Sequence, residues 1–216
     1  MTQVTALWGL ISLSGALSVL FLLRFSTQGP SLSKTAVKTA SVAGLAVAAI
    51  LAHGPVWLVL ALTLASIGDF LLSRDGEGAF LAGLVAFALS HLAYVVLMLG
   101  TGAALEFGPL AVAVVIFGIA TAVVLFPRAG ALRWPVVVYV LIICAMAAVA
   151  VSLPASFLTA VVAALLFLLS DWVLGAERFL LSPQSMLRHI TAYVIWTTYW
   201  LAQLLFLVAF AIERSL

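Results

Sequence analysis

Two aspartates stand inside long apolar stretches of the sequence, where a charged side chain is unusual. Asp69 falls in the stretch 56–73 and Asp171 in the stretch 155–174, each shortly before a polar segment. A carboxylate at the centre of a membrane helix costs about 2.5–3.5 kcal/mol on insertion scales, so it indicates a functional site. By helical rise, both lie about 6 Å from the same end of their helices. We therefore expect the two carboxyls at one depth in the membrane.

Two carboxyls that share a sheltered cleft favour acid–base chemistry. Mutual repulsion and loss of hydration leave one protonated and one ionised near neutral pH, as hydrolysis by a carboxyl pair requires. Lys38, Tyr139 and Tyr193 fall within about one helical turn of the same level. The sequence thus predicts Asp69 and Asp171 as the catalytic residues. The alternative is structural: each aspartate caps a helix, pairs with Lys38 or a loop arginine, or lies at the membrane interface.

A second polar group is expected nearer the centre of the membrane. His91 lies about 18 Å into the stretch 79–99 and shares a helical face with Tyr94. Gln203, about 21 Å into the stretch 189–212, could meet both across helices. The alternative is that His91 is only a hydrogen-bonded packing residue. No HxxxH pair occurs, and we expect neither a metal nor another cofactor.

Composition determines the kind of protein that carries these residues. Of the 216 residues, 66% are hydrophobic and only 7% are charged, against about 25% charged in an ordinary soluble domain. These values exclude a soluble enzyme, a secreted disulfide scaffold and a disordered binder. Cys144 is the single cysteine, which excludes an internal disulfide and a paired-cysteine zinc site. The chain is therefore expected to be an integral membrane protein.

Eight apolar stretches are long enough, or nearly so, to cross a bilayer, which takes about 20 mostly apolar residues. They are 4–23, 35–52, 56–73, 79–99, 107–126, 134–151, 155–174 and 189–212. These stretches predict an all-α fold, a polytopic bundle of about eight transmembrane helices. Residues 1–216 are expected to form a single integral membrane domain.

The basic residues predict how the bundle is oriented. Eight of the nine lie in or beside alternate connections, the side that we take as cytoplasmic. They are Arg24, Lys34, Lys38, Arg74, Arg128, Arg133, Arg178 and Arg188. Only Arg214 falls on the opposite side, so both termini are expected on the non-cytoplasmic side and the aspartates near the cytoplasmic face. The net charge of +2 then reflects topology, and no nucleic-acid partner is expected.

Several motifs follow one another in order along most of the chain. They are Lys38, the pair Gly68-Asp69, the block Phe80, Gly83, Phe87, His91 and Tyr94, the group Phe167, Ser170 and Asp171, and the late Tyr199 and Gln203. In this order and spacing the chain resembles the YhhN family of membrane proteins, whose characterised members are lysoplasmalogenases. It departs from the family pattern at Thr39, where a proline is usual, and at Ala163, where a glycine is usual.

The resemblance implies hydrolysis of the sn-1 vinyl ether of a lysoplasmalogen to a fatty aldehyde and glycerophospho-ethanolamine or -choline. The catalytic residues would be Asp69 and Asp171. The candidate substrate-binding residues are Lys38, His91, Tyr94, Tyr139, Tyr193, Tyr199 and Gln203. The lipid phosphate could be held by Lys38, Arg74 and Arg178, unless these residues only set the topology. The expected partners are a lysophospholipid and membrane lipid, in what looks like a bacterial cytoplasmic membrane; another lysolipid is an alternative substrate.

Cleavage of a vinyl ether suits a pair of carboxyls. Protonation of the β-carbon leaves an oxocarbenium ion, to which water adds before the hemiacetal collapses. Glycosidases use two carboxyls around a similar cation. Either aspartate fits the part of proton donor, with the other stabilising the cation and orienting water.

Two other classes of protein place carboxylates inside the membrane. A proton-coupled or lipid-moving transporter fits buried carboxylates, His91, and the weak echo between Gly68-Asp69 and Ser170-Asp171. No Gly or Pro interrupts matching spans at mid-membrane, however. An intramembrane aspartyl protease also needs two aspartates on separate spans, but its glycine-x-glycine-aspartate motif does not occur. The hydrolase is therefore the preferred interpretation, and the transporter is the alternative.

Overall fold

A computed structural model describes residues 2–213, which form eight α-helices and no strand. The helices are α1 (Thr2–Leu20), α2 (Leu32–Leu51), α3 (Val56–Leu72), α4 (Glu77–Leu99), α5 (Pro109–Leu125), α6 (Arg133–Val151), α7 (Leu158–Phe179) and α8 (Leu187–Leu207). π-Helical turns extend α1 over Phe21–Phe25 and α8 over Val208–Ile212. The prediction of an all-helical chain with eight helices is confirmed.

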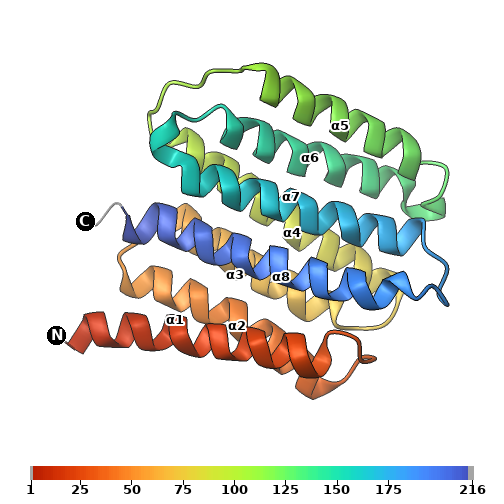
Figure 1. The fold of residues 1–216 in the computed structure, drawn as a ribbon, viewed down its shortest axis with the longest axis horizontal. Helices are drawn as coiled ribbons and strands as arrows, with labels where there is room; N and C mark the ends of the chain where they lie inside the picture. The colour runs from red at the N-terminus through yellow and green to blue at the C-terminus, as the bar shows by residue number, and fades with distance from the viewer. Residues whose placement is uncertain (1, 214–216) are drawn as a thin grey trace.

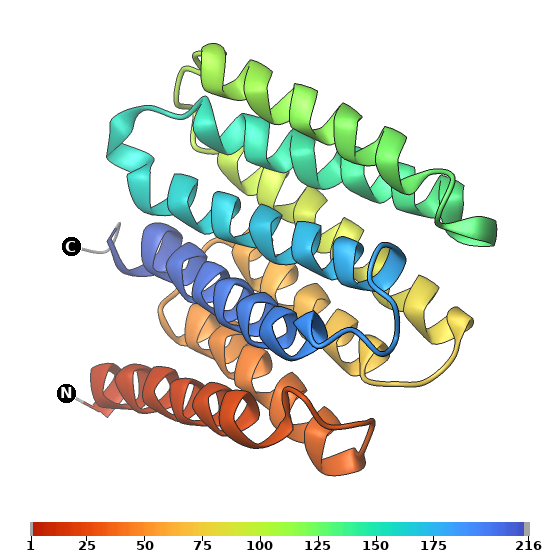
Figure 2. The same ribbon diagram turned by 45° about the vertical axis from the view of Figure 1, so that its right-hand side comes forward.

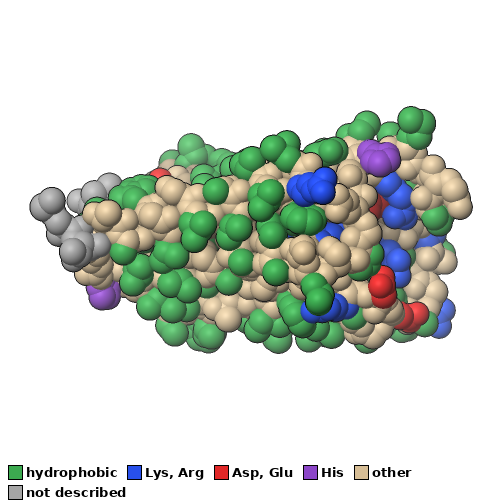
Figure 3. All heavy atoms as spheres, turned by 90° about the horizontal axis from the view of Figure 1, so that it is seen from below, with side chains coloured by type: hydrophobic (Ala, Val, Ile, Leu, Met, Phe, Trp, Pro, Cys, Tyr) green, Lys and Arg blue, Asp and Glu red, His purple; other side chains and the backbone are tan. Residues whose placement is uncertain are grey.

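The helices have the length and surface of membrane spans. Six helical units are long and apolar enough to cross a bilayer: Gln3–Phe25, Leu32–Leu51, Glu77–Leu99, Gly130–Val151, Ala155–Phe179 and Leu187–Ile212. α3 and α5 are apolar but have 17 residues each, about 26 Å of helix against about 30 Å of hydrocarbon. In Figure 3, Lys, Arg, Asp and Glu gather toward one end, and the rest of this face is mostly hydrophobic. Such a surface indicates an integral multi-pass membrane protein.

The helices pack as successive hairpins, with the two aspartate-bearing hairpins at the centre. The closest pairings are α3 with α4 and α7 with α8. The hairpin of α1 and α2 lies on one side of this centre, and that of α5 and α6 lies on the other (Figures 1 and 2). Asp69 on α3 and Asp171 on α7 are therefore both carried by the middle of the bundle.

Both ends of the described chain lie at the same end of the bundle, on the left of Figure 1. The connections α1–α2, α3–α4, α5–α6 and α7–α8 lie at the opposite end, where the predicted cytoplasmic basic residues are carried. Which end faces the cytoplasm stays a prediction. Arg214, the one basic residue expected on the other side, lies outside the described residues.

Two glycines let α3 and α4 approach closely beside the site. A Cβ at Gly68 would stand 2.6 Å from Cε2 of Phe87, and a Cβ at Gly83 would stand 2.7 Å from Cδ2 of Leu72. Any side chain at either glycine would displace these groups, because real Cβ atoms do not come so close. Small residues are the usual means by which membrane helices pack tightly. Here they set the positions of Phe87 and Leu72.

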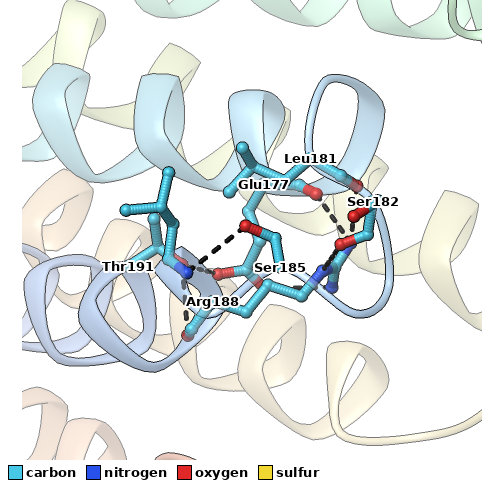
Figure 4. A network of polar contacts seen from close by, with 7 residues as sticks. Glu177, Leu181, Ser182, Ser185, Arg188 and Thr191 are labelled. Carbon is cyan, nitrogen blue, oxygen red and sulfur yellow. Dashed lines mark hydrogen bonds and ion pairs between the residues drawn. The ribbon is translucent and has the colours of Figure 1, made fainter.

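α7 is longer than the sequence predicted, ending at Phe179 rather than at residue 174. Arg188 caps this end: Nη2 donates to the carbonyl oxygens of Glu177 at 2.8 Å and Leu181 at 3.3 Å, as Figure 4 shows. Basic side chains commonly satisfy the last carbonyls of a helix in this way. Asp171 therefore lies roughly 12 Å from the end of its helix, twice the predicted depth.

Candidate active site

Asp69 and Asp171 line one cleft in the central part of the bundle. The cleft has a volume of about 1370 Å³, part of it open to solvent. Its walls come from the ends of α2, α3, α4, α7 and α8 near the basic connections, together with Phe21 beyond α1. The structure thus brings into one lining two carboxyls that are about 100 residues apart in the sequence.

The Asp69 carboxyl is held by a lysine and a phenol. Its side chain is 1% exposed, and Nζ of Lys38 lies 3.0 Å from Oδ1. The Tyr199 hydroxyl donates to Oδ2 at 2.7 Å. A charge removed from water needs a counter-charge and hydrogen bonds on its remaining oxygen, and Asp69 has both. The Lys38 ammonium also lies 5.9 Å from the ring centroid of Trp196, within the range of a cation–π contact.

The Asp171 carboxyl has a different set of partners. Its Oδ2 accepts a hydrogen bond from the Tyr139 hydroxyl, and Nε2 of His91 lies 3.1 Å from the same oxygen. Nε2 of His91 is also 3.0 Å from the Tyr139 hydroxyl, so the three side chains form one compact group. Within residues 2–213, Oδ1 of Asp171 has no hydrogen-bond partner. This oxygen is therefore available to a substrate in the cleft.

An aromatic wall joins these two polar groups. The ring of Phe167 lies 4.5 Å from the His91 ring and 5.4 Å from the Tyr199 ring, measured between centroids. Phe87 packs edge-on against Phe167 at 6.3 Å and against Tyr199 at 5.6 Å. Apolar rings beside charged groups lower the local dielectric and strengthen the interactions of those groups. Few water molecules can screen the two carboxyls from a bound substrate on this side.

His91 does not belong to the group in which the sequence placed it. Gln203 accepts from the Tyr94 hydroxyl at 2.5 Å, the cross-helix contact that was predicted. His91 instead contacts Asp171, because the longer α7 carries Asp171 toward the depth of His91. Tyr94 and Gln203 are fully buried and do not line the cleft. Tyr193 is 43% exposed and lies outside the cleft lining as well.

Arginines and lysines surround the mouth of the cleft. Arg188 already has partners. It caps α7, and its Nη1 lies 3.6 Å from Oε1 of Glu177 (Figure 4). The other carboxylate oxygen of Glu177, Oε2, accepts a hydrogen bond from the Thr191 hydroxyl. Arg74 and Arg178 lie over aromatic rings, at 4.5 Å from the Phe70 centroid and 5.1 Å from the Phe80 centroid. Neither arginine forms an ion pair with any described residue. Their guanidinium groups are free to bind an anion.

Trp196 is a site residue that the sequence analysis did not single out. It is 3% exposed, lines the cleft, and donates through Nε1 to the Ser18 carbonyl oxygen at 3.0 Å. That bond fixes the ring against which Lys38 lies. A signal existed, since Trp196 precedes Tyr199 by three residues and therefore shares its helical face.

The fold and the site define a polytopic helical membrane protein with a cleft lined by two aspartates from the middle helices, Asp69 and Asp171. The chain belongs to the YhhN family, whose pattern matches residues 33–210. It is 35% identical over 189 residues to the lysoplasmalogenases of Mycobacterium bovis and Mycobacterium tuberculosis. The alignment covers 82% of this chain and 70% of each relative. No solved structure matches the chain.

Proposed function

We propose that this protein is a lysoplasmalogenase that cleaves the sn-1 vinyl ether of a lysoplasmalogen. The products are a fatty aldehyde and glycerophospho-ethanolamine or -choline. Family membership and the names of the two mycobacterial relatives support the reaction. The observation that carries the proposal is a single cleft lined by Asp69 and Asp171, only one of which is paired with a lysine.

The different partners of the carboxyls support different roles for them. Nζ of Lys38 lies 3.0 Å from Oδ1 of Asp69 and the Tyr199 hydroxyl donates to Oδ2, so both oxygens of Asp69 are engaged. Asp171 is held by a phenol and an imidazole and keeps one oxygen unbonded within the described chain. Asp171 is therefore the general acid, and Asp69 is the anion that stabilises the cationic intermediate.

The reaction then follows from ordinary acid catalysis. Asp171 transfers its proton to the β-carbon, where the π electrons form the new C–H bond, and an oxocarbenium ion develops at the carbon bearing oxygen. Water adds to that carbon and returns a proton to the Asp171 carboxylate. The hemiacetal collapses as its hydroxyl loses a proton, the bond to the glycerol oxygen breaks, and that oxygen is protonated. One water is consumed, and the acid is regenerated.

The mouth of the cleft suits the polar half of the substrate. Arg74 and Arg178 line it without an ionic partner in the described chain, and arginine binds phosphate oxygens through paired N–H groups. In the proposal the lipid phosphate binds these two arginines. Lys38 and Tyr199 position Asp69. His91 and Tyr139 position Asp171. The basic connections support a bacterial cytoplasmic membrane as the location, with the cleft open on the cytoplasmic side.

The test is aldehyde release by purified protein in detergent. Asp69→Asn and Asp171→Asn are each expected to abolish release while the protein keeps its helical content. Glu106→Gln is the matched carboxyl-to-amide control, because Glu106 is exposed in the α4–α5 connection away from the cleft. Activity that survives in either aspartate variant would remove that residue from the mechanism. Hydrolysis without an ion gradient also distinguishes this enzyme from a proton-coupled transporter.

A further inference from the structure

A second cavity lies between α4, α5, α6 and α7, and it is almost wholly apolar. It has a volume of about 650 Å³. Leu84 of α4, Thr121 of α5, Val140 and Ile143 of α6, and Leu168 of α7 contribute to its walls. Asp171 is the one carboxylate or basic group in the described lining. Such a pocket offers a polar ligand no charged partner except Asp171.

The apolar pocket and the polar cleft meet at Asp171. Leu72, Phe80, Phe87 and Leu174 line both cavities, and Asp171 does so too. The two cavities are therefore adjacent arms, one apolar and one polar, that share Asp171 and four apolar residues in their walls. One arm is lined by hydrocarbon, and the other carries Arg74, Arg178 and the pair of Lys38 with Asp69.

The apolar arm reaches the surface that faces lipid. Phe117 of α5 and Trp172 of α7 both line the pocket, and they are 38% and 43% exposed. Their ring centroids are 6.0 Å apart. α5 packs mainly along α6, and these two rings, one from α5 and one from α7, are partly exposed members of the pocket wall. A hydrocarbon chain that enters the pocket from the bilayer would pass beside them.

We propose that the apolar pocket holds the single hydrocarbon chain of a lysolipid while the phosphate-bearing half occupies the cleft. The inference rests on the proposed function and adds where the substrate chain lies. A lysolipid has one apolar chain joined to one charged head, the same division as the two joined cavities. In a 1-alkenyl lysolipid the vinyl ether is the junction of these halves, so it falls beside Asp171. One apolar arm also predicts selection against a two-chain lipid, whose second chain has no matching compartment beside the cleft.

The decisive variant fills the pocket without disturbing the site. Thr121→Phe places a ring in the pocket from a half-buried position on α5. Ile119→Phe is the matched control, since Ile119 is 53% exposed on the same helix and does not line the pocket. If Thr121→Phe does not fold, Leu168→Phe fills the same pocket from α7, where Leu168 is also half-buried. Neither position contacts Asp171 through any hydrogen bond or ion pair in the described chain.

Two measurements separate this inference from the proposed function. The first is kcat/KM for alkenyl lysolipids of increasing chain length. Thr121→Phe is expected to lower it about tenfold or more for the longest chains, and less for short ones, whereas Ile119→Phe matches wild type. The second is thermal stabilisation by 1-O-alkyl lysophosphoethanolamine, which lacks the vinyl bond and cannot be hydrolysed. Stabilisation should grow with chain length in wild type and lose that dependence in Thr121→Phe.

Each outcome bears on a different claim. The chain pocket is overturned if kcat/KM depends on chain length as in wild type in all three variants, Thr121→Phe, Leu168→Phe and Ile119→Phe. The proposed hydrolysis would not be affected by that result. If wild type releases no aldehyde but binds the alkyl lysolipid with the expected chain dependence, the proposed reaction fails and the chain pocket stands. Wild type that is not stabilised by any alkyl lysolipid overturns the chain pocket.

Discussion

Nζ of Lys38 lies 3.0 Å from Oδ1 of Asp69, a carboxyl whose side chain is 1% exposed. The pair joins α2 to α3 inside the bundle and leaves Asp171, on the far wall of the same cleft, without a lysine or arginine partner among the described residues. This asymmetry distinguishes two residues of the same type. It leaves Asp171 as the carboxyl with an oxygen unbonded within the described chain, which is the property that the proposed mechanism asks of the proton donor.

The lysine of this pair can be tested through stability. Lys38→Met leaves the Asp69 carboxylate buried without its cation, which is expected to cost about 3–5 kcal/mol of unfolding free energy. Adding Asp69→Asn removes the uncompensated charge, so the double variant should be more stable than Lys38→Met alone, although inactive. Thermal unfolding in detergent measures both. A double variant no more stable than the single one would show that Asp69 is not held as an anion by Lys38.

The phenol that holds Asp171 should matter for the chemical step. Tyr139→Phe removes the hydrogen bond to Oδ2, which strengthens as Asp171 gives up its proton and becomes a carboxylate, so a fall in kcat on the order of 10- to 100-fold is expected. KM should change little, because the hydroxyl acts through Asp171. Tyr193→Phe is the control, since it deletes the same hydroxyl from a residue outside the cleft lining. Equal effects in the two variants would contradict the assignment and would return Tyr193 to the site.

Headgroup recognition should depend on two arginines at the mouth. Arg74→Ala with Arg178→Ala is expected to raise KM about tenfold while leaving kcat nearly unchanged, the signature of lost ground-state binding. The control is Arg128→Ala with Arg133→Ala, which removes two cations at the α5–α6 connection. Neither residue lines the cleft, so this double variant should leave KM unchanged. An alkenylglycerol without phosphate checks the cause. If the first double variant also weakens its turnover, the arginines do not act on phosphate.

The carbon atom that receives the proton can be identified by isotope labelling of the aldehyde product. In D2O, protonation of the vinyl ether predicts one deuterium on the carbon next to the aldehyde carbon, since Asp171 exchanges its proton with solvent. Trapping the aldehyde with borohydride as it forms, followed by mass spectrometry, measures the label. Aldehyde incubated with the Asp171→Asn protein corrects for later exchange. An unlabelled product would exclude β-carbon protonation and require another mechanism.

The helical frame could be predicted because membrane crossing imposes a simple requirement on length and polarity. Eight apolar stretches predicted eight helices, and most ends agree within three residues. The end of α7 was the main exception. Gly175, Glu177 and Arg178 are typical of a helix end, yet the helix continues because Arg188, from the next helix, satisfies its last carbonyls. A cap supplied from that distance gives no local signal.

The candidate site was predictable only where it is polar. Asp69, Asp171 and Lys38 stand out because charge is rare inside apolar stretches. The link between His91 and Asp171 depends on the length and tilt of two helices, so the spacing within either helix could not show it. The apolar pocket was not predictable for a further reason. Its walls are built from Leu, Val, Ile and Phe, the same residue types that face lipid elsewhere on the chain.

The position of Asp171 in the walls of both cavities also bears on where the products of the proposed reaction would go. Cleavage there would leave a hydrophobic aldehyde in the arm that meets the bilayer beside Phe117 and Trp172, and a water-soluble phosphodiester in the arm that opens among the arginines. Each fragment would then face the phase in which it dissolves. Under the proposed function, one product would return to the membrane and the other would leave to the aqueous compartment.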